Sequence, residues 1–321
     1  MTRARGLVLV VLGLAAAGLM AAWALLGTAT IARETSFTIP AGASVASIAD
    51  KLEAEGLITS ASGFVLQARI FGADAPIQAG EFLLTPGMSQ GDILAAFQSG
   101  DVIRRFVTIP EGMPSILVWE RLMAEELLTG EVPVPPEGSI LPDTYAFERG
   151  QTRASLVAQM QAAMDRALAE EWAKRGPGIA VDTMRDALIL ASIVEKETGK
   201  PEERRMVAGL YSNRVRTGMM LQADPTIIYP ITRGKPLGRR IRQSEIAAVN
   251  GYNTYTRVGL PEGPITNPGR ASIAAVMNPE NTGALFMVAD GTGGHWFADT
   301  LAEHNANVAK WYAIRRERGE M

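Results

Sequence analysis

The most pronounced pattern in the sequence is an uncharged apolar run over residues 6–26, which reads GLVLVVLGLAAAGLMAAWALL. A helix needs about 20 apolar residues to cross the hydrocarbon core of a bilayer, so the run predicts a transmembrane helix over residues 6–27. Arg3 and Arg5 precede it, and the positive-inside rule places residues 1–5 in the cytoplasm and the rest of the chain outside. A cleaved signal peptide is the alternative, but the apolar core of such a peptide spans only about 7–15 residues.

A second pattern follows, in which a short β-type run, a proline–glycine turn and an amphipathic helix succeed one another. It occurs three times, beginning at Phe37, Phe82 and Val107. Alternating apolar and β-branched residues predict the strands, and the Pro-Gly or Pro-x-Gly sequences predict the turns. Ser44 and Ser89 precede the first two helices and are predicted to be their N-caps.

A further helix is predicted over residues 62–71, between the first two of these units. Residues 33–105 are therefore expected to form a small α/β module of strand–helix–helix–strand type. This module resembles the LysM-like modules that bind the glycan of peptidoglycan. The resemblance implies a glycan grip, and a packing platform or spacer is the alternative.

The third unit begins a larger second domain over residues 106–321, for which the pattern predicts an α+β fold. Apolar residues at helical spacing predict helices over residues 114–126, 152–174, 183–198 and 201–217, and a last one over 301–316. After Leu221 the chain is rich in Gly, Pro, Asn and Tyr, which predicts loops. Near its end, LFMVAD and HWFA are predicted to be two strands joined by the glycine turn GTGG.

Composition excludes several kinds of chemistry. The chain has 321 residues, a net charge of −3 and no cysteine, so disulfides and thiolate metal sites are excluded and nothing suggests a nucleic-acid partner. The two histidines, His295 and His304, lack metal-ligand spacing. Phosphate-binding glycine loops and the G-x-S-x-G elbow are absent. We therefore expect neither a metal nor a cofactor.

Two carboxylates, Glu195 and Glu197, end the most apolar of the predicted helices. A helix that is apolar nearly all round is buried, and its C-terminal end disfavours negative charge. Both effects raise the pKa of a carboxyl group, as a general acid requires near neutral pH. The two side chains are about 200° apart on the helix, so only one is expected to face a cleft. The alternative is a solvated helix end paired with Lys196 and nearby arginines.

Polar and aromatic residues gather in the predicted loops, and their amide, hydroxyl and ring groups suit a polyhydroxylated ligand. The candidates are Asp143 and Tyr145 in PEGSILPDTYAF, Gln222, Asp224 and Thr226 in LQADPTIIYP, and Tyr252, Asn253, Thr254 and Tyr255 in NGYNTYT. His295 is expected to close the final hairpin or to line the cleft. The alternative for each is a role in shaping turns.

Several long motifs, namely ILASIVEKET, NRVRTGMMLQADPTIIY, GYNTYTRVGLPEGPITNPG, FMVADGTGGHWFADT and EHNANV, stand in an order that resembles the endolytic murein transglycosylase, or YceG-like, family. The resemblance covers nearly the whole chain. It implies an N-terminal transmembrane helix, a LysM-like module and a larger α+β catalytic domain. PEGSILPDTY departs from the family pattern at Ser139 and Ile140.

The resemblance implies a lytic transglycosylase that cleaves the β-1,4 bond between N-acetylmuramic acid and N-acetylglucosamine in nascent strands and leaves a 1,6-anhydro end. By alignment Glu197 is then the catalytic residue and Glu195 a supporting one, while the segments 222–226 and 253–255 orient the sugar. A muramidase and a non-catalytic peptidoglycan-binding scaffold are the rival hypotheses.

The resemblance also implies where the protein acts and what it meets. It implies a single-pass protein of the plasma (inner) membrane with its catalytic domain on the extracytoplasmic side. The expected partners are peptidoglycan glycan strands, the lipid bilayer, and peptidoglycan synthases or divisome proteins.

Overall fold

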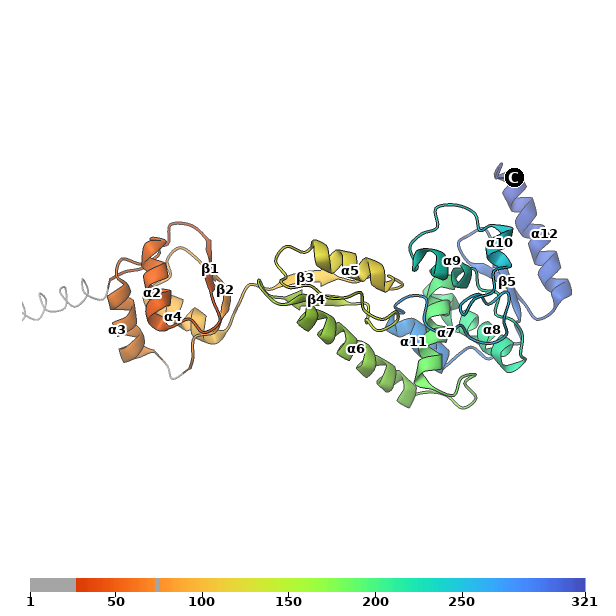
Figure 1. Ribbon diagram of the computed structural model, residues 1–321, viewed down its shortest axis with the longest axis horizontal. Coiled ribbons are helices and arrows are strands. Elements are labelled where there is room, and N and C mark those ends of the chain that lie inside the picture. Colours follow the sequence, from red (N-terminus) through yellow and green to blue (C-terminus); the bar gives the residue numbers. More distant parts are fainter. Residues whose placement is uncertain (1–26, 73–74, 321) are drawn as a thin grey trace, which may run out of the picture. The chain divides into compact units, whose positions relative to one another are not determined.

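The computed structural model describes residues 27–72 and 75–320. Apart from Gly27, the predicted transmembrane helix over residues 6–27 lies outside this part of the chain. Among the described residues, no helix combines the length and the apolar character that crossing a bilayer requires. The chain divides after Arg105 into two compact units, whose elements are labelled in Figure 1.

The N-terminal unit, as far as it is described, combines a two-stranded antiparallel sheet with three helices. Its elements are β1 (Thr35–Ile39), α2 (Val45–Ala54), α3 (Ala61–Phe71), β2 (Gly80–Leu84) and α4 (Gln90–Ser99). The predicted order of strand, two helices and strand is confirmed, and α4 follows it. Phe37 of β1 pairs with Phe82 of β2, and both rings pack against Phe97 of α4 in the core, with centroids 5.6 and 4.9 Å away.

Both predicted N-caps of this unit are confirmed. The Ser44 hydroxyl accepts a hydrogen bond from the backbone N–H of Ser47 at 3.1 Å, and Ser89 accepts one from Asp92 at 3.2 Å. The Asp92 carboxylate in turn accepts from the Ser89 N–H at 2.8 Å, which completes a capping box. Such a cap stabilises a helix by about 1 kcal/mol, because it satisfies backbone donors that the helix itself leaves unpaired.

The first described residues are bound directly to the body of the N-terminal unit. The Thr59 N–H donates to the Thr28 carbonyl at 3.0 Å, and the Thr30 N–H donates to the Leu57 carbonyl at 2.8 Å. Gly27 has a φ of +73°, and a Cβ atom there would lie 2.8 Å from Cβ of Ser60. The folded unit therefore begins within a few residues of the end of the apolar run.

The C-terminal unit begins with a small layer of two strands and two helices. These are β3 (Arg105–Thr108), α5 (Ser115–Ala124), β4 (Thr144–Phe147) and α6 (Arg153–Ala173). The strands β3 and β4 form one two-stranded sheet, and α5 and α6 are labelled beside it in Figure 1. Val107, Phe147, Val118 and Leu156 from the four elements share one buried cluster.

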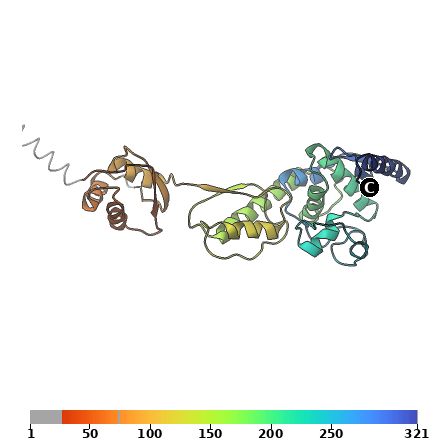
Figure 2. The ribbon, with the colours of Figure 1, turned by 90° about the horizontal axis from the view of Figure 1, so that it is seen from above.

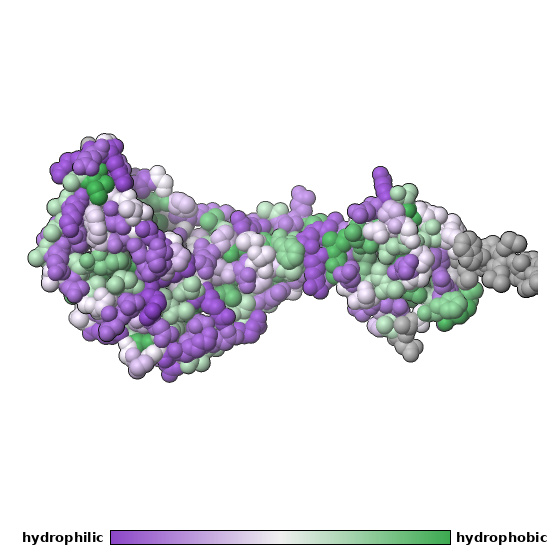
Figure 3. Space-filling view, turned by 180° about the vertical axis from the view of Figure 1, so that it is seen from behind, coloured by the Kyte–Doolittle hydropathy of each residue, from purple (hydrophilic) through white to green (hydrophobic). Residues whose placement is uncertain are grey.

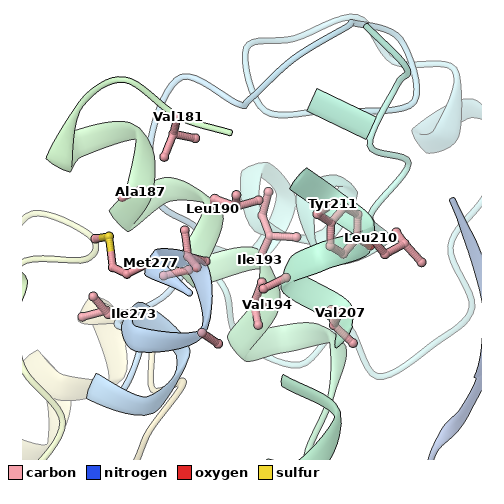
Figure 4. Packing of buried hydrophobic residues seen from close by; sticks show 14 of the residues in the cluster. Val181, Ala187, Leu190, Ile193, Val194, Val207, Leu210, Tyr211, Ile273 and Met277 are labelled. Carbon is pink, nitrogen blue, oxygen red and sulfur yellow. The ribbon is translucent and has the colours of Figure 1, made fainter. Parts of the chain in front are cut away.

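The largest core of the molecule surrounds α7 (Met184–Glu197). Leu190, Ile193 and Val194 of α7 pack against residues of α8 (Arg204–Arg216) and α11 (Arg270–Met277), as Figure 4 shows. Burial on nearly every side explains why α7 is apolar up to its last turn. The predicted helices over residues 152–174, 183–198 and 201–217 are confirmed, the last with a short 3-10 turn at Pro201–Glu203 before α8.

The remaining elements cover α7 and α8. They are α9 (Pro225–Thr232), α10 (Gln243–Ile246), the antiparallel hairpin of β5 (Phe286–Ala289) and β6 (His295–Ala298), and α12 (Leu301–Glu317). The predicted hairpin and the predicted final helix are confirmed. In Figure 2, α12 extends at the end of the unit. Hydrophilic residues dominate the face of this unit that Figure 3 presents, as is usual for a water-exposed surface.

Two sequence predictions were wrong. The segment after Leu221 was expected to be loops, but it contains α9, α10 and α11. Pro225 begins α9 at a position where the missing N–H costs nothing, so proline there starts a helix instead of breaking one. The segment with Asp143 and Tyr145 was expected to be a loop, but β4 begins within it at Thr144, because pairing with β3 holds this stretch extended.

Candidate active site

Glu197 is the last residue of α7, and its carboxyl group lies at the C-terminal end of the buried helix. Burial raises the pKa of this carboxyl group to about 7, and the negative charge of Asp224 adds to the shift. A hydrogen bond from the Tyr211 hydroxyl opposes it. The Oε1 atom of Glu197 is buried and has no hydrogen-bond partner among the described residues. The group is therefore protonated at neutral pH more readily than an ordinary glutamate, and one of its oxygens keeps its hydrogen-bonding capacity unused.

Glu197 lines a polar cavity of about 250 Å³, here called the acid cavity. Its lining comes from α7, α8, the segment before α9, the loop at Tyr255 and the final hairpin: Glu197, Leu210, Tyr211, Arg214, Gln222, Asp224, Tyr255, Met287, Val288, Ala289 and His295. Five residues predicted for the site are thus brought together although they are far apart in the sequence. The five are Glu197, Gln222, Asp224, Tyr255 and His295.

A second carboxylate, that of Asp224, opens into the same cavity. Its side chain is exposed, and its Oδ1 accepts a hydrogen bond from the Tyr255 hydroxyl at 2.6 Å. Burial raises the pKa of Tyr255, and this hydrogen bond raises it further. Tyr255 therefore remains a neutral donor that fixes the orientation of Asp224.

The residues next to Asp224 and Tyr255 in the sequence form a buried polar framework. The hydroxyls of Thr226 and Thr254 are 2.8 Å apart, and the Thr254 hydroxyl accepts from the Ala223 N–H at 3.0 Å. Gln222 has a φ of +51°, a left-handed conformation that costs a non-glycine residue about 1–2 kcal/mol. Because Gln222 N–H donates to the Thr254 carbonyl at 3.1 Å, the framework holds it in that conformation beside Asp224.

Asn253 also belongs to this framework and not to the cavity wall. It is fully buried, and its Nδ2 donates to the carbonyls of Ile246 and Ala248 at 2.9 and 2.7 Å. Its Oδ1 accepts from the Tyr255 N–H at 2.9 Å. Thr226, Asn253 and Thr254 were predicted to orient a ligand, and the structure places them where they position Asp224 and Tyr255.

His295 enters the acid cavity from the hairpin and is held by Glu203. The His295 N–H donates to Glu203 Oε1 at 2.9 Å, and the ring Nδ1 lies 2.8 Å from Glu203 Oε2. Burial alone would raise the pKa of Glu203, but hydrogen bonds from His295 and Thr198 hold it below its usual value. Glu203 therefore remains a carboxylate that fixes the imidazole, a role that the sequence analysis did not anticipate.

Glu195 points away from the acid cavity. Its Oε2 accepts a hydrogen bond from the Gly269 N–H, the N-cap of α11, at 2.9 Å, and its Oε1 lies 3.8 Å from Nη2 of Arg204. Negative charge is favourable at a helix N-terminus. Glu195 therefore ties α7 to α11, in agreement with only one of the two carboxylates facing the cleft.

Three other predicted residues lie outside the acid cavity. Asp143 is exposed, and its Oδ1 accepts from the Thr144 N–H at 2.7 Å. The Tyr145 hydroxyl donates to the Leu141 carbonyl at 2.7 Å. The Tyr252 ring packs 4.8 Å from the ring of Tyr229.

Sequence reasoning missed Tyr211 and Arg214, through which α8 contributes to the wall of the acid cavity. Arg214 Nε donates to the Leu285 carbonyl at 2.7 Å, and its guanidinium lies over the Phe286 ring at 5.7 Å. It therefore joins α8 to the final hairpin. A signal exists in the sequence, because Tyr211 and Arg214 are three residues apart and share a helix face otherwise filled by apolar residues.

A second cavity has a volume of about 480 Å³ and is here called the apolar cavity. It is lined by the β3–α5 loop, the end of α7, α9 and the segment behind it: Pro110, Glu111, Gly112, Met113, Pro114, Leu117, Lys196, Pro225, Ile228, Gly234, Lys235, Pro236, Leu237 and Ile265. Although it is larger, the carboxyl group with the raised pKa, that of Glu197, lines the acid cavity. We therefore place the candidate chemistry in the acid cavity. No cluster of metal-ligating side chains occurs among residues 27–72 and 75–320.

Comparison with known proteins agrees with this geometry. The family model of the YceG-like family matches residues 37–310. An endolytic murein transglycosylase of Streptococcus pneumoniae (strain D39) is 30% identical over 85% of this chain and 57% of the relative, so the chain spans little more than half the length of that protein. One of Bacillus subtilis (strain 168) is 26% identical over 88% of this chain and 86% of the relative.

A solved structure supports the same relationship. The crystal structure of a YceG-like protein from Listeria monocytogenes superposes with a TM-score of 0.53 at 28% sequence identity. The match covers 85% of this chain and 99% of that one. Since the family model also matches most of the sequence, the chain belongs to the YceG-like family.

Proposed function

We propose that this protein is an endolytic lytic transglycosylase that cleaves the β-1,4 bond between N-acetylmuramic acid and N-acetylglucosamine and so terminates nascent peptidoglycan strands. Relatives from two organisms carry the name endolytic murein transglycosylase. The observation that carries the proposal is Glu197, a carboxyl group whose pKa is raised to about 7 and whose unpartnered Oε1 belongs to a cavity-lining side chain. This combination suits a general acid.

The reaction needs one acid–base group. The protonated Glu197 carboxyl donates its proton to the glycosidic oxygen as the bond from C1 of muramic acid breaks. The resulting carboxylate then accepts the proton of the C6 hydroxyl as O6 attacks C1, which closes the 1,6-anhydro ring. No water is consumed, and Glu197 returns to its protonated form.

The other cavity residues support the charge that develops at C1. The Asp224 carboxylate lines the cavity and is a negative group that suits an oxocarbenium-like ring. Tyr255 fixes Asp224, and Glu203 fixes His295, so neither group needs to reorganise when the charge appears. Gln222 supplies an amide for the sugar hydroxyls.

A muramidase is the second candidate, and Asp224 is the observation that favours it. Glycoside hydrolases generally use two carboxyl groups, the second to attack or to activate water. Glu197 and Asp224 line one cavity, so a water molecule activated by Asp224 is a chemically consistent alternative to the C6 hydroxyl.

Product mass separates the two candidates. Purified, uncross-linked glycan strands would be digested with the full-length protein, and the new reducing ends analysed by mass spectrometry. We expect anhydro ends, which are lighter by one water than hydrolysed ends. Exclusively hydrolysed ends would establish the muramidase, and intact strands under conditions that support a known transglycosylase would contradict both.

We also propose that residues 6–27 anchor the protein in the plasma membrane and that the N-terminal unit is a LysM-like module that grips glycan outside the cytoplasm. Support comes from the uncharged run and from the backbone hydrogen bonds that begin the folded unit at Thr28. Such an anchor would hold Glu197 near the membrane, where synthases or divisome proteins extend strands. Extraction of the protein by alkaline carbonate without detergent would contradict the anchor.

A further inference from the structure

The apolar cavity and the acid cavity are lined by two pairs of consecutive residues. At the end of α7, Lys196 lines the apolar cavity and Glu197 lines the acid cavity. At the start of α9, Pro225 lines the apolar cavity and Asp224 lines the acid cavity. Consecutive Cα atoms are about 3.8 Å apart. At both points the wall of the acid cavity is therefore continued, along the chain, by the wall of the apolar cavity.

The lining of the apolar cavity does not suit a sugar. Apart from three charged residues and two glycines it consists of proline, leucine, isoleucine and methionine side chains. It offers neither amide groups nor aromatic faces for sugar hydroxyls and rings. Its volume of about 480 Å³ falls in the range of about 300–1,000 Å³ that is typical of ligand sites. The volume of the acid cavity lies below this range.

One positive charge in the apolar cavity is uncompensated. Lys235 pairs with Glu120, and Glu111 pairs with Arg204 at 2.8 Å. Lys196 is exposed and has no hydrogen-bond or ion-pair partner among the described residues. The cavity therefore combines an apolar wall with one available cation, a combination complementary to a small apolar group linked to a carboxylate.

We propose that the apolar cavity binds the first residues of the peptide that muramic acid carries on its lactyl group, with Lys196 pairing with a peptide carboxylate. This inference rests on the proposed function, in which the ring attacked at C1 is the muramic acid itself. The acid cavity, at about 250 Å³, is too small for that ring together with its peptide, so the peptide must leave it. Alanine methyl groups match the apolar wall, and the glutamyl carboxylate matches Lys196.

The test compares peptide-bearing glycan strands with the same strands stripped by an amidase, using the full-length protein. We expect the wild type to prefer the peptide-bearing strands by about tenfold in kcat/KM, which corresponds to one charge-assisted contact. In Lys196→Gln and in Leu237→Trp, which fills the cavity, this ratio should fall to about one. Lys310→Gln, which removes an exposed lysine on α12, is the matched control and should keep the wild-type ratio.

Each outcome decides the matter. A wild-type ratio near one, or an unchanged ratio in both cavity variants, would overturn the peptide site while leaving the proposed function intact. Loss of cleavage of both substrates by the wild type would contradict the proposed function instead. In that case, calorimetric titration of Glu197→Gln with a soluble muramoyl peptide still tests the site, because binding should be weakened about tenfold by adding Lys196→Gln and unchanged by adding Lys310→Gln.

Discussion

Two partly buried carboxyl groups of the C-terminal unit, Glu197 and Glu137, each have a pKa raised to about 7, and in both burial is the main cause. Their surroundings differ. Glu137 Oε1 accepts from the Ser115 N–H at 2.9 Å and lies 3.4 Å from the Asn267 amide, and the Tyr229 hydroxyl also donates to the carboxylate. Glu197 keeps an unpartnered Oε1 and lines a cavity. A raised pKa marks burial, whereas a carboxyl group that lines a cavity and keeps an unpartnered oxygen is the better candidate for an acid.

The two groups also lie at opposite poles of helices. Glu137 accepts a hydrogen bond from the first residue of α5, where the helix dipole favours negative charge. Glu197 ends α7, where the dipole disfavours it, and Asp224 adds a second negative charge. Glu137 is thus built to hold three segments together, and Glu197 to give up and regain a proton.

The largest expected effect comes from Glu197→Gln. An amide of the same shape cannot donate the catalytic proton, and general acid–base catalysis contributes about 10²–10⁴-fold. We expect the release of anhydro ends from purified strands to fall by roughly 10³-fold, with the thermal unfolding transition retained. A variant within about tenfold of the wild-type rate would remove Glu197 from the chemistry.

Next in size should be Asp224→Asn. The substitution keeps a partner for Tyr255 but removes the charge that stabilises positive character at C1, and removal of one preorganised electrostatic contact costs about 10²–10³-fold. We expect roughly 10²-fold lower kcat with anhydro products still formed. A wild-type rate would show that Asp224 acts neither on the sugar nor on water. Selective loss of hydrolysed ends from a mixture would assign it to the activation of water.

The two carboxyl groups were not equally predictable from the sequence. The apolar run of α7 and the unfavourable end of its helix dipole are both visible in the sequence, and together they indicate residues 195–197. Glu137 gave no such signal, because its burial comes from Ser115, Tyr229 and Asn267, all distant in the chain. Local patterns report the burial of a helix, but the burial of a loop depends on contacts that no local pattern encodes.

The same limit applies to the elements and to the cavity wall. Helices with three or more turns and one apolar face were predictable, whereas α9, with Pro225 and Pro230 in eight residues, was not. Asp224 and Tyr255 were expected near Glu197 from their chemistry. Asn253 was not distinguishable from them, because whether an amide faces a ligand or three backbone carbonyls is decided by the fold of the loop around it.

The pH dependence of kcat/KM should show an effect of moderate size that comes from the ionisation of Glu197. The acid must be protonated, so kcat/KM should fall above pH 7 by about tenfold per pH unit and be flat just below it. In Asp224→Asn the descending limb should move to lower pH, because the charge that raises the pKa of Glu197 is absent. Measurement of kcat/KM between pH 5 and 9 on stripped strands tests both, and a limb that stays in place would contradict the coupling.

Glu137→Gln should change stability and leave the reaction nearly untouched, within about threefold in kcat/KM. Unfolded glutamate ionises near pH 4.5 and folded Glu137 near 7, so the folded state binds more protons between these values. The contribution of Glu137 to stability should therefore be complete below about pH 4.5 and be lost as the pH rises to about 7, by about 3 kcal/mol in all. In Glu137→Gln this part of the decrease in stability between pH 4.5 and 7 should be absent.

Urea unfolding at pH 5 and pH 8 measures this dependence. Glu197 contributes a shift of the same sign, so the measurement is cleanest in a Glu197→Gln background, where Glu137 alone remains. An equal pH dependence with and without Glu137 in that background would show that its carboxyl group is not held protonated. A loss of activity beyond tenfold in Glu137→Gln alone would place it in the chemistry after all.

The smallest expected effect is that of Asp143→Ala. Asp143 was a candidate site residue, but it lies outside the acid cavity, is exposed, and its carboxylate accepts a hydrogen bond only from the N–H of Thr144. Loss of one exposed local hydrogen bond costs about 0.5–1.5 kcal/mol of stability and no contact with the sugar. We expect kcat/KM within about twofold of the wild type and a slightly lower urea midpoint. A drop in rate as large as that of Asp224→Asn would mean that the bound glycan strand extends over β4. Asp143 would then belong to the substrate-binding site.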